Sequence, residues 1–157
     1  MAEVEIGLGK TAKRAYRLDD VAIVPTRRTR DPEDVDISWE IDAYRFEVPI
    51  LGAPADSVTS PATAVELGRL GSAGVLHLEG LWTRYEDPEP VLDEIASLPP
   101  AKATARLQEL YAEPVRPELI GRRIAEIKGA GVTCAVAVTP GRTLELDALS
   151  SWFAAKV

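Results

Sequence analysis

The sequence predicts an α/β fold in which parallel strands are joined by helices, and three observations lead to this prediction. Residues 46–78 read as a strand, a loop, a helix and a second strand. Residues 131–138 form a continuous apolar run, which is typical of a buried parallel strand. The stretch between them carries apolar residues at helical spacing. Strands connected through helices in this way favour right-handed parallel crossovers.

Composition and charge limit the class of protein. The chain has 157 residues, of which 46% are hydrophobic and 27% charged, as expected for one globular domain. The formal net charge of -7 argues against nucleic-acid binding. No apolar run is long enough for a membrane span, and the amino terminus lacks the apolar core of a signal peptide, so we expect no membrane association and a cytoplasmic location. One cysteine and one histidine exclude a disulfide framework and the usual Cys and His zinc sites, and we predict no metal site.

The first 20 residues carry a glycine-rich stretch, Gly7-Leu8-Gly9-Lys10-Thr11, that superficially suggests a phosphate-binding loop. The spacing excludes this interpretation, since Val4 stands where such a loop needs its first glycine. We therefore expect an extended arm whose basic side chains lie over a neighbouring element or subunit: Lys10, Lys13, Arg14 and Arg17.

A β-hairpin or ribbon is predicted between this arm and the central unit. Residues 17–25 read as a short edge strand that ends at Pro25. Residues 35–41 alternate apolar and polar side chains, which is the two-residue period of a half-buried strand. The intervening arginines, Arg27, Arg28 and Arg30, have two interpretations: a phosphate contact, or the more common solvated face or subunit contact.

The central unit has clear boundaries. A strand at Val48–Leu51 ends at Gly52, and the helix that follows has Ser60 as its cap, Pro61 in its first turn and Gly71 at its end. The next strand is Gly74–Leu78. Because ligands collect at the carboxyl ends of parallel strands, the candidate site positions are residues 52–57 and 77–80.

The rest of the chain reads as three helices, a strand and a last helix. We expect the helices at residues 86–98, 101–112 and 117–129. The strand at 131–138 is followed by a turn at Thr139-Pro140-Gly141, which would add a third site loop. Residues 143–157 read as a final amphipathic helix.

Three segments resemble the IMP dehydrogenase and GMP reductase family, in the order and spacing of that family. Residues 18–25 are similar to its "DDV..VP" segment, residues 48–59 to its "P.V....MDTVT" segment, and residues 70–77 to its "GGIGVIH" segment. The resemblance implies the amino-terminal part of a (β/α)8 TIM barrel, with about three parallel strands and a preceding β-ribbon. It divides the chain into an arm and ribbon (1–45) and a partial barrel (46–157), with helices at 86–130 in place of the CBS domains of many members.

The resemblance also implies an activity. It points to an NAD-dependent oxidoreductase of purine and guanine nucleotide biosynthesis that oxidises IMP to XMP, with a purine nucleotide as partner. A monovalent cation is possible in a full-length enzyme, and a homo-oligomer, specifically a tetramer, is implied. A GMP reductase-like enzyme is the alternative, but the lysine that is prominent in that branch is Leu78 here.

Site residues follow from the same resemblance. The family's serine and methionine of the nucleotide site are replaced here by Ala53 and Ala55. Asp56 has two interpretations, a ligand contact or a loop-orienting residue. His77 is interpreted as a packed residue in preference to an acid or base. The predicted substrate-binding residues are Ala53, Pro54, Ala55, Asp56, Ser57 and His77.

No catalytic or cofactor-binding residue is assigned. In the family a cysteine thiolate attacks the purine from a loop after the sixth strand, and the phosphate-binding loops and cation site also lie late in the chain. Cys134 falls within an apolar strand, where burial raises the thiol pKa, so we expect a small hydrophobe. We therefore expect an amino-terminal fragment. The alternatives are a non-catalytic half-barrel that acts only through association, and an unrelated three-layer α/β binding domain.

Overall fold

A computed structural model of the chain describes residues 3–24 and 31–143. The contacts of the chain group Met1–Asp36 and Ile37–Val157 into two units, and each is described by itself. The predicted division after residue 45 stays a prediction about domains.

The first unit contains a β-hairpin that the sequence prediction missed. Strand β1 (Glu3–Gly7) pairs antiparallel with β2 (Lys10–Lys13), with an irregular register between Glu5 and Gly7. Gly9 has a φ of 70°, which glycine adopts readily in a turn. The expected extended arm is thus a folded-back ribbon.

The edge strand predicted at residues 17–25 is wrong for the described part of that segment. Leu18–Asp20 form a 3₁₀ turn, η1, and Val21–Val24 belong to no strand. The Arg17 backbone N–H donates to the Asp20 carboxylate at 3.0 Å, so the acidic side chain caps a local turn. A second 3₁₀ turn, η2, covers Pro32–Asp34.

The hairpin that precedes the barrel strands exists, but with other partners than expected. Strand β3 (Trp39–Ile41) pairs antiparallel with β4 (Tyr44–Phe46). The predicted strand at 35–41 is therefore shorter, and its partner follows it in the chain. Asp42, with a φ of 51°, provides the left-handed turn residue between them. Trp39 and Phe46 stack across the pair, with ring centroids 5.2 Å apart.

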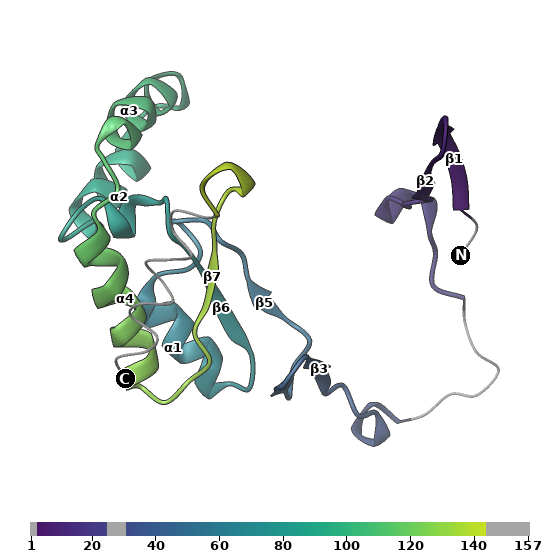
Figure 1. The fold of residues 1–157 in the computed structure, drawn as a ribbon. Coiled ribbons are helices and arrows are strands. Elements are labelled where there is room, and N and C mark those ends of the chain that lie inside the picture. Colours follow the sequence, from purple (N-terminus) through teal and green to yellow (C-terminus); the bar gives the residue numbers. More distant parts are fainter. Residues whose placement is uncertain (1–2, 25–30, 144–157) are drawn as a thin grey trace. The chain divides into compact units, whose positions relative to one another are not determined.

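Three parallel strands form the sheet that positions the site, in the order β5-β6-β7 (Figure 1). They are β5 (Leu51–Gly52), β6 (Ala73–His77) and β7 (Ala135–Ala137). Gly52 aligns with Gly74, and His77 with Ala137. This confirms the predicted parallel arrangement of adjacent strands, although β5 and β7 are shorter than expected.

In the described ranges, four helices connect and flank this sheet. Helix α1 (Pro61–Arg69) joins β5 to β6, and its Ser60 cap accepts the Thr63 N–H at 3.0 Å, as predicted. Three more helices follow β6 in the chain and precede β7: α2 (Glu89–Ser97), α3 (Pro100–Ala112) and α4 (Pro117–Gly129). Short 3₁₀ turns follow the strands: η3 (Leu81–Thr83) and η4 (Pro140–Arg142). The predicted helix at 143–157 lies outside the described residues, save its first position.

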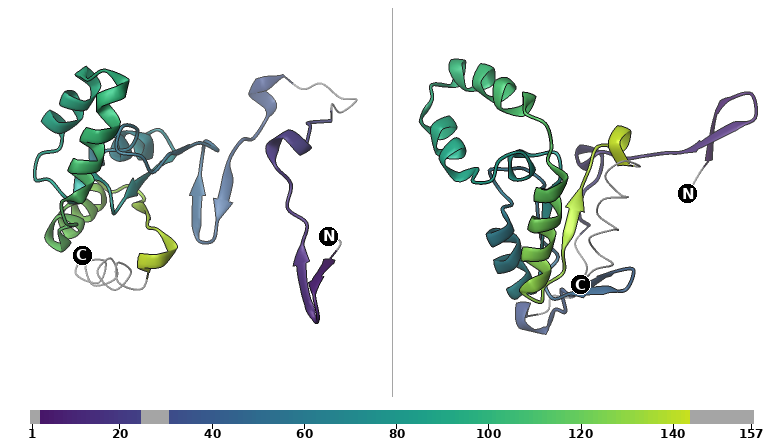
Figure 2. Two further views of the ribbon diagram at one scale, coloured as in Figure 1. Left: turned by 90° about the horizontal axis from the view of Figure 1, so that it is seen from above. Right: turned by 60° about the vertical axis from the view of Figure 1, so that its left-hand side comes forward.

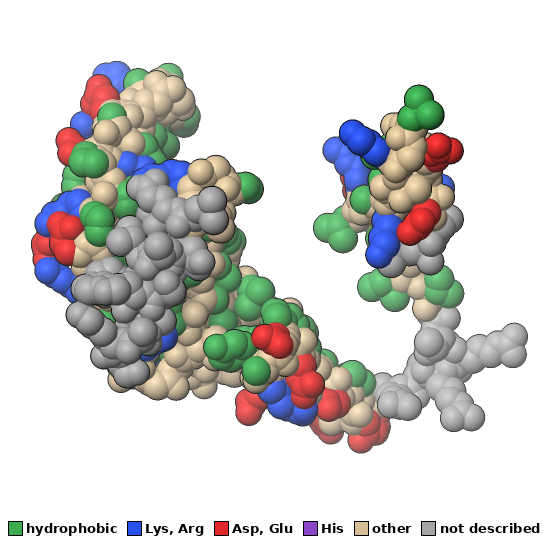
Figure 3. Space-filling view, viewed as in Figure 1, with side chains coloured by type: hydrophobic (Ala, Val, Ile, Leu, Met, Phe, Trp, Pro, Cys, Tyr) green, Lys and Arg blue, Asp and Glu red, His purple; other side chains and the backbone are tan. Residues whose placement is uncertain are grey.

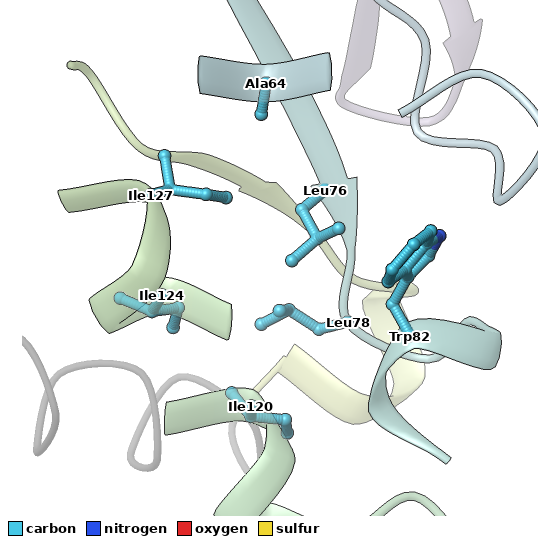
Figure 4. Close-up of a cluster of buried hydrophobic side chains, with 7 residues drawn as sticks. All are labelled: Ala64, Leu76, Leu78, Trp82, Ile120, Ile124 and Ile127. Atoms are coloured by element: carbon cyan, nitrogen blue, oxygen red, sulfur yellow. The ribbon is translucent and has the colours of Figure 1, made fainter. Parts of the chain in front are cut away.

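The core lies between one face of the sheet and helices α1 and α4 (Figure 4). Because Gly74 has no side chain, α1 approaches β6 closely: a Cβ at that position would lie 2.7 Å from the Ala64 Cα. Helix α4 contributes three isoleucines to the cluster. Its buried members are Ala64, Leu76, Leu78, Trp82, Ile120, Ile124 and Ile127.

Strand β7 is less buried than its apolar sequence suggested. The expectation of full burial at 131–138 is wrong, since Val136 is 38% exposed and Ala135 and Ala137 are only partly buried. The reason is position, because β7 is an outer strand of the described sheet. Strand β5 is shortened because Pro49, inside the predicted strand, has no N–H to donate.

Helices α2 to α4 carry a surface where acidic and basic side chains intermingle (Figure 3). Arg106 of α3 bridges to Glu94 of α2 at 2.7 Å, and Arg122 of α4 pairs with Glu86. Among the described residues no helix is both long and apolar enough to cross a membrane.

Candidate functional site

The loop after β5 is the first part of the candidate site. Its backbone is folded by local hydrogen bonds: the N–H groups of Val58 and Thr59 both donate to the Ala55 carbonyl at 2.9 Å. The Thr59 hydroxyl donates to the Ala53 carbonyl at 2.7 Å. These bonds define residues 53–59 as a compact turn, which we call the rim loop.

Asp56 connects the rim loop to the segment after β6. Its Oδ2 accepts the Leu81 backbone N–H at 2.9 Å, and its own carbonyl accepts the Trp82 indole N–H at 3.4 Å. Its Oδ1 is buried with no hydrogen-bond partner among the described residues. Gly80 permits this approach, since a Cβ there would lie 2.1 Å from Oδ1. The loop-orienting interpretation of Asp56 therefore has a structural basis.

A cavity of about 470 Å³ lies beside the rim loop, and five of the six predicted site residues line it. They are Pro54, Ala55, Asp56, Ser57 and His77. The sixth, Ala53, does not line this cavity, and its carbonyl serves the internal bonds of the loop. The structure thus brings residues from the carboxyl ends of β5 and β6 to one place, which follows from the parallel arrangement.

The opposite wall of the cavity comes from helices α2 and α3, which the sequence analysis did not assign to the site. Its side chains are Leu92 and Ile95 of α2 and Leu107 and Tyr111 of α3, and Leu81 of η3 completes the lining. Figures 1 and 2 show these helices beyond the end of the sheet at which β6 and β7 terminate. The missed signal was Tyr111, an aromatic residue on the apolar side of its helix with a hydroxyl that needs a partner.

Tyr111 donates its hydroxyl to the Asp56 Oδ2. Burial, together with this bond to a carboxylate, raises the pKa of Tyr111 well above its ordinary value. The Arg84 guanidinium lies over the tyrosine ring, 5.5 Å from its centroid, and opposes the shift only in part. Tyr111 is therefore a stable hydrogen-bond donor across the neutral pH range.

Glu79 joins the loops that follow β6 and β7. Its carboxylate accepts the Thr139 N–H at 2.6 Å and the Thr139 hydroxyl at 3.2 Å, and Arg142 lies 3.7 Å away. Burial opposes ionisation, but the Thr139 hydrogen bonds and the Arg142 charge outweigh it and lower the pKa of Glu79. The predicted third site loop is thereby fixed to the second.

Arg123 of α4 holds the chain that leaves the site. It is largely buried, donates to the Trp82 carbonyl at 3.2 Å and the Glu86 carbonyl at 2.7 Å, and lies 5.6 Å from the Trp82 ring centroid. The Arg123 guanidinium is thus occupied by ring packing and by hydrogen bonds to backbone carbonyls, so the role of Arg123 is structural.

Cys134 does not belong to this cavity. It packs against the core cluster, and burial raises the pKa of its thiol, as the sequence analysis predicted. No group of three or more His, Cys, Asp or Glu in the described ranges is arranged to bind a metal ion.

The fold and the position of this cavity define the class: the chain has the fold of the amino-terminal part of a (β/α)8 barrel, with its candidate site at the carboxyl ends of the strands. A crystal structure of an IMP dehydrogenase/GMP reductase-like protein from Corynebacterium glutamicum matches it with a TM-score of 0.81 and 39% identity. The match covers 96% of this chain and 42% of that one.

A comparison with models of protein families identifies the family to which this chain belongs. The IMP dehydrogenase / GMP reductase domain matches residues 15–93, and the chain belongs to this family. A protein of Mycobacterium tuberculosis named an uncharacterized oxidoreductase is 50% identical over 142 residues, covering 87% of this chain. An inosine-5'-monophosphate dehydrogenase of Methanocaldococcus jannaschii is 41% identical over 66 residues, 42% of this chain and 13% of its own length.

The chain spans 38% of the length of the mycobacterial relative. Membership of the family rests on the domain match, whereas the activity of the whole protein belongs to the proposal that follows.

Proposed function

We propose that the chain is the amino-terminal part of an IMP dehydrogenase-like oxidoreductase of purine nucleotide metabolism, which oxidises IMP to XMP with NAD in the cytoplasm as a homo-oligomer. The observation that carries the proposal is the cavity at the rim loop, in a chain of this family. In this proposal, the chain contributes one wall of the nucleotide pocket.

The chemistry of the cavity supports a base or ribose ring as its occupant. The walls from α2 and α3 are largely apolar and fit a flat ring, while Asp56 and His77 supply polar groups at the strand ends. The described residues that line the cavity include no Lys or Arg side chain that would neutralise a phosphate. We therefore assign no residue to the phosphate group or to NAD, which when bound supplies the hydride acceptor.

No covalent step is assigned to this chain. The family's reaction needs a thiolate beside the purine, and the only thiol in the sequence is Cys134, which packs partly buried against the core and has a raised pKa. We expect residues 1–157 alone to bind IMP weakly and to give no NAD reduction with IMP and no NADPH oxidation with GMP.

The test combines a binding measurement with an activity assay. IMP is titrated calorimetrically into the wild-type chain and an Ala55→Trp variant, in which the large side chain fills the cavity. Loss of the IMP signal in the variant is expected, and equal affinity for both would overturn the assignment of the cavity. Turnover that Cys134→Ser abolishes without changing the thermal midpoint would show that Cys134 is the nucleophile.

A non-catalytic half-barrel is the second candidate. One observation favours it: β5 and β7 are outer strands of the described sheet, and strands with unpaired edges tend to associate. No IMP binding together with a stable oligomer in light scattering would select this candidate.

A further inference from the structure

We infer that Tyr111 is a positioning residue for the rim loop, and that its hydroxyl sets the orientation of Asp56. The inference rests on the proposed function in one respect, that the rim loop forms a wall of the nucleotide pocket. Tyr111 comes from α3, a helix between β6 and β7, and reaches across the cavity to the loop after β5.

The Asp56 carboxylate depends on two donors. Both the Leu81 N–H, at 2.9 Å, and the Tyr111 hydroxyl donate to Oδ2. Within the described part of the chain, Oδ1 has no hydrogen-bond partner, and it packs against Gly80. Removing the tyrosine hydroxyl would leave a single backbone donor to hold the carboxylate.

Because most side chains of the rim loop are small, the loop depends on hydrogen bonds to neighbouring segments for its position. Ala53 and Ala55 bear only methyl groups, and Pro54 and Ser57 form no side-chain hydrogen bond among those found in the described residues. Among the described residues, the loop is folded internally by backbone bonds and the Thr59 hydroxyl, and its hydrogen bonds to the segments that face it all involve Asp56.

Tyr111 is itself well placed to act as the anchor. The Arg84 guanidinium lies over its ring and also donates to the Glu79 carbonyl at 3.1 Å. The preceding residue, the buried Leu110, accepts the Tyr85 hydroxyl on its carbonyl at 3.1 Å. One hydrogen bond, from Tyr85, and one cation–π contact, from Arg84, thus hold this end of α3, and its tyrosine transmits that position to the loop.

The test is amide hydrogen exchange in the 157-residue chain, with two matched variants. Tyr111→Phe removes only the hydroxyl that reaches Asp56. Tyr85→Phe removes a hydroxyl that holds the same helix without touching Asp56. We expect Tyr111→Phe to speed exchange at the Leu81, Val58 and Thr59 amides about fivefold, the effect of losing one ordinary hydrogen bond. Tyr85→Phe should leave these three amides near the wild-type rates.

Two exchange results would overturn the inference. One is an unchanged rate at these amides in Tyr111→Phe, and the other is an equal rise in both variants, which would mean that α3 had merely loosened.

Titration with IMP separates this inference from the proposed function. Weaker IMP binding by Tyr111→Phe than by Tyr85→Phe supports both. If wild-type chain does not bind IMP but the exchange pattern appears, the nucleotide proposal fails for this chain and the positioning role stands. Faster exchange with unchanged IMP affinity would refute the role of loop orientation in binding.

Discussion

Residues 3–24 and residues 46–138 are similarly rich in apolar side chains, but only the second segment buries them. In the first, Leu8 and Ile23 are almost fully exposed and no residue is buried. In the second, Leu76 and Ile127 are completely buried between the sheet and its helices. A two-stranded ribbon by itself cannot cover its own apolar face, whereas a strand–helix–strand unit contains the second layer that does so.

The largest expected effect is at the centre of the buried segment. Leu76→Ala removes a fully buried side chain from the core and should lower the free energy of unfolding by about 2–5 kcal/mol. Urea unfolding followed by circular dichroism measures it. A loss below about 1 kcal/mol would mean that the sheet and helices do not pack as one core.

Gly80→Ala should have the next largest effect. The added methyl would lie 2.1 Å from the Asp56 Oδ1, and displacing the buried carboxylate should cost about 1–3 kcal/mol. Gly129→Ala is the matched control, because nothing lies within 4 Å of its added Cβ and alanine favours a helix. Equal thermal midpoints for the two variants would contradict the close approach of Asp56 to Gly80.

Glu79→Gln tests the connection between the loops after β6 and β7 through its pH dependence. The folded state lowers the pKa of Glu79 below its ordinary value, so the charged form stabilises the fold at pH values above the pKa of the unfolded state. The advantage of wild type over the variant should be on the order of 1 kcal/mol near neutral pH. It should disappear as the pH falls through the folded-state pKa.

Urea unfolding over a pH series provides the measurement, and Glu66→Gln is the control. Glu66 pairs with Arg69 on the exposed surface, where an ion pair contributes little. A Glu79→Gln difference that grows toward acidic pH would have the wrong sign for this account.

The smallest effect is expected in the ribbon. Leu8→Ser replaces an almost fully exposed side chain and should change the free energy of unfolding by less than about 0.5 kcal/mol. The same urea experiment measures it. A loss comparable to that of Leu76→Ala would show that Leu8 is covered by a surface in solution, and would remove the contrast between the two segments.

Local sequence signals predicted the buried segment well. Ser60, Pro61 and Gly71 set the limits of α1 because caps and breakers act over a few residues. Likewise, the three apolar runs gave the parallel strands. Prediction was poorer where partners decide the structure: residues 17–24 have strand-like side chains, but Asp20 caps a turn.

For the candidate site, the sequence predicted one wall of the cavity and missed the other, again because local signals do not show which elements meet. Parallel topology brings the ends of consecutive strands together, so the Pro54–Ser57 and His77 wall followed from element order. The wall from α2 and α3 did not follow, since helical periodicity gives the apolar face but not the element that it meets. Only coordinates show that Tyr111 meets Asp56, 55 residues away.

The bond between Glu79 and Thr139 has a consequence for how the chain folds. The two residues are 60 positions apart, so the pairing of β6 with β7 must close a long loop that contains three helices. By contrast, β5, α1 and β6 are consecutive and need only short closures. Because closing a longer loop costs more chain entropy before its contacts form, β5–α1–β6 should assemble first and β7 should join late. Time-resolved exchange labelling during refolding would then protect the Val75 amide before that of Ala137.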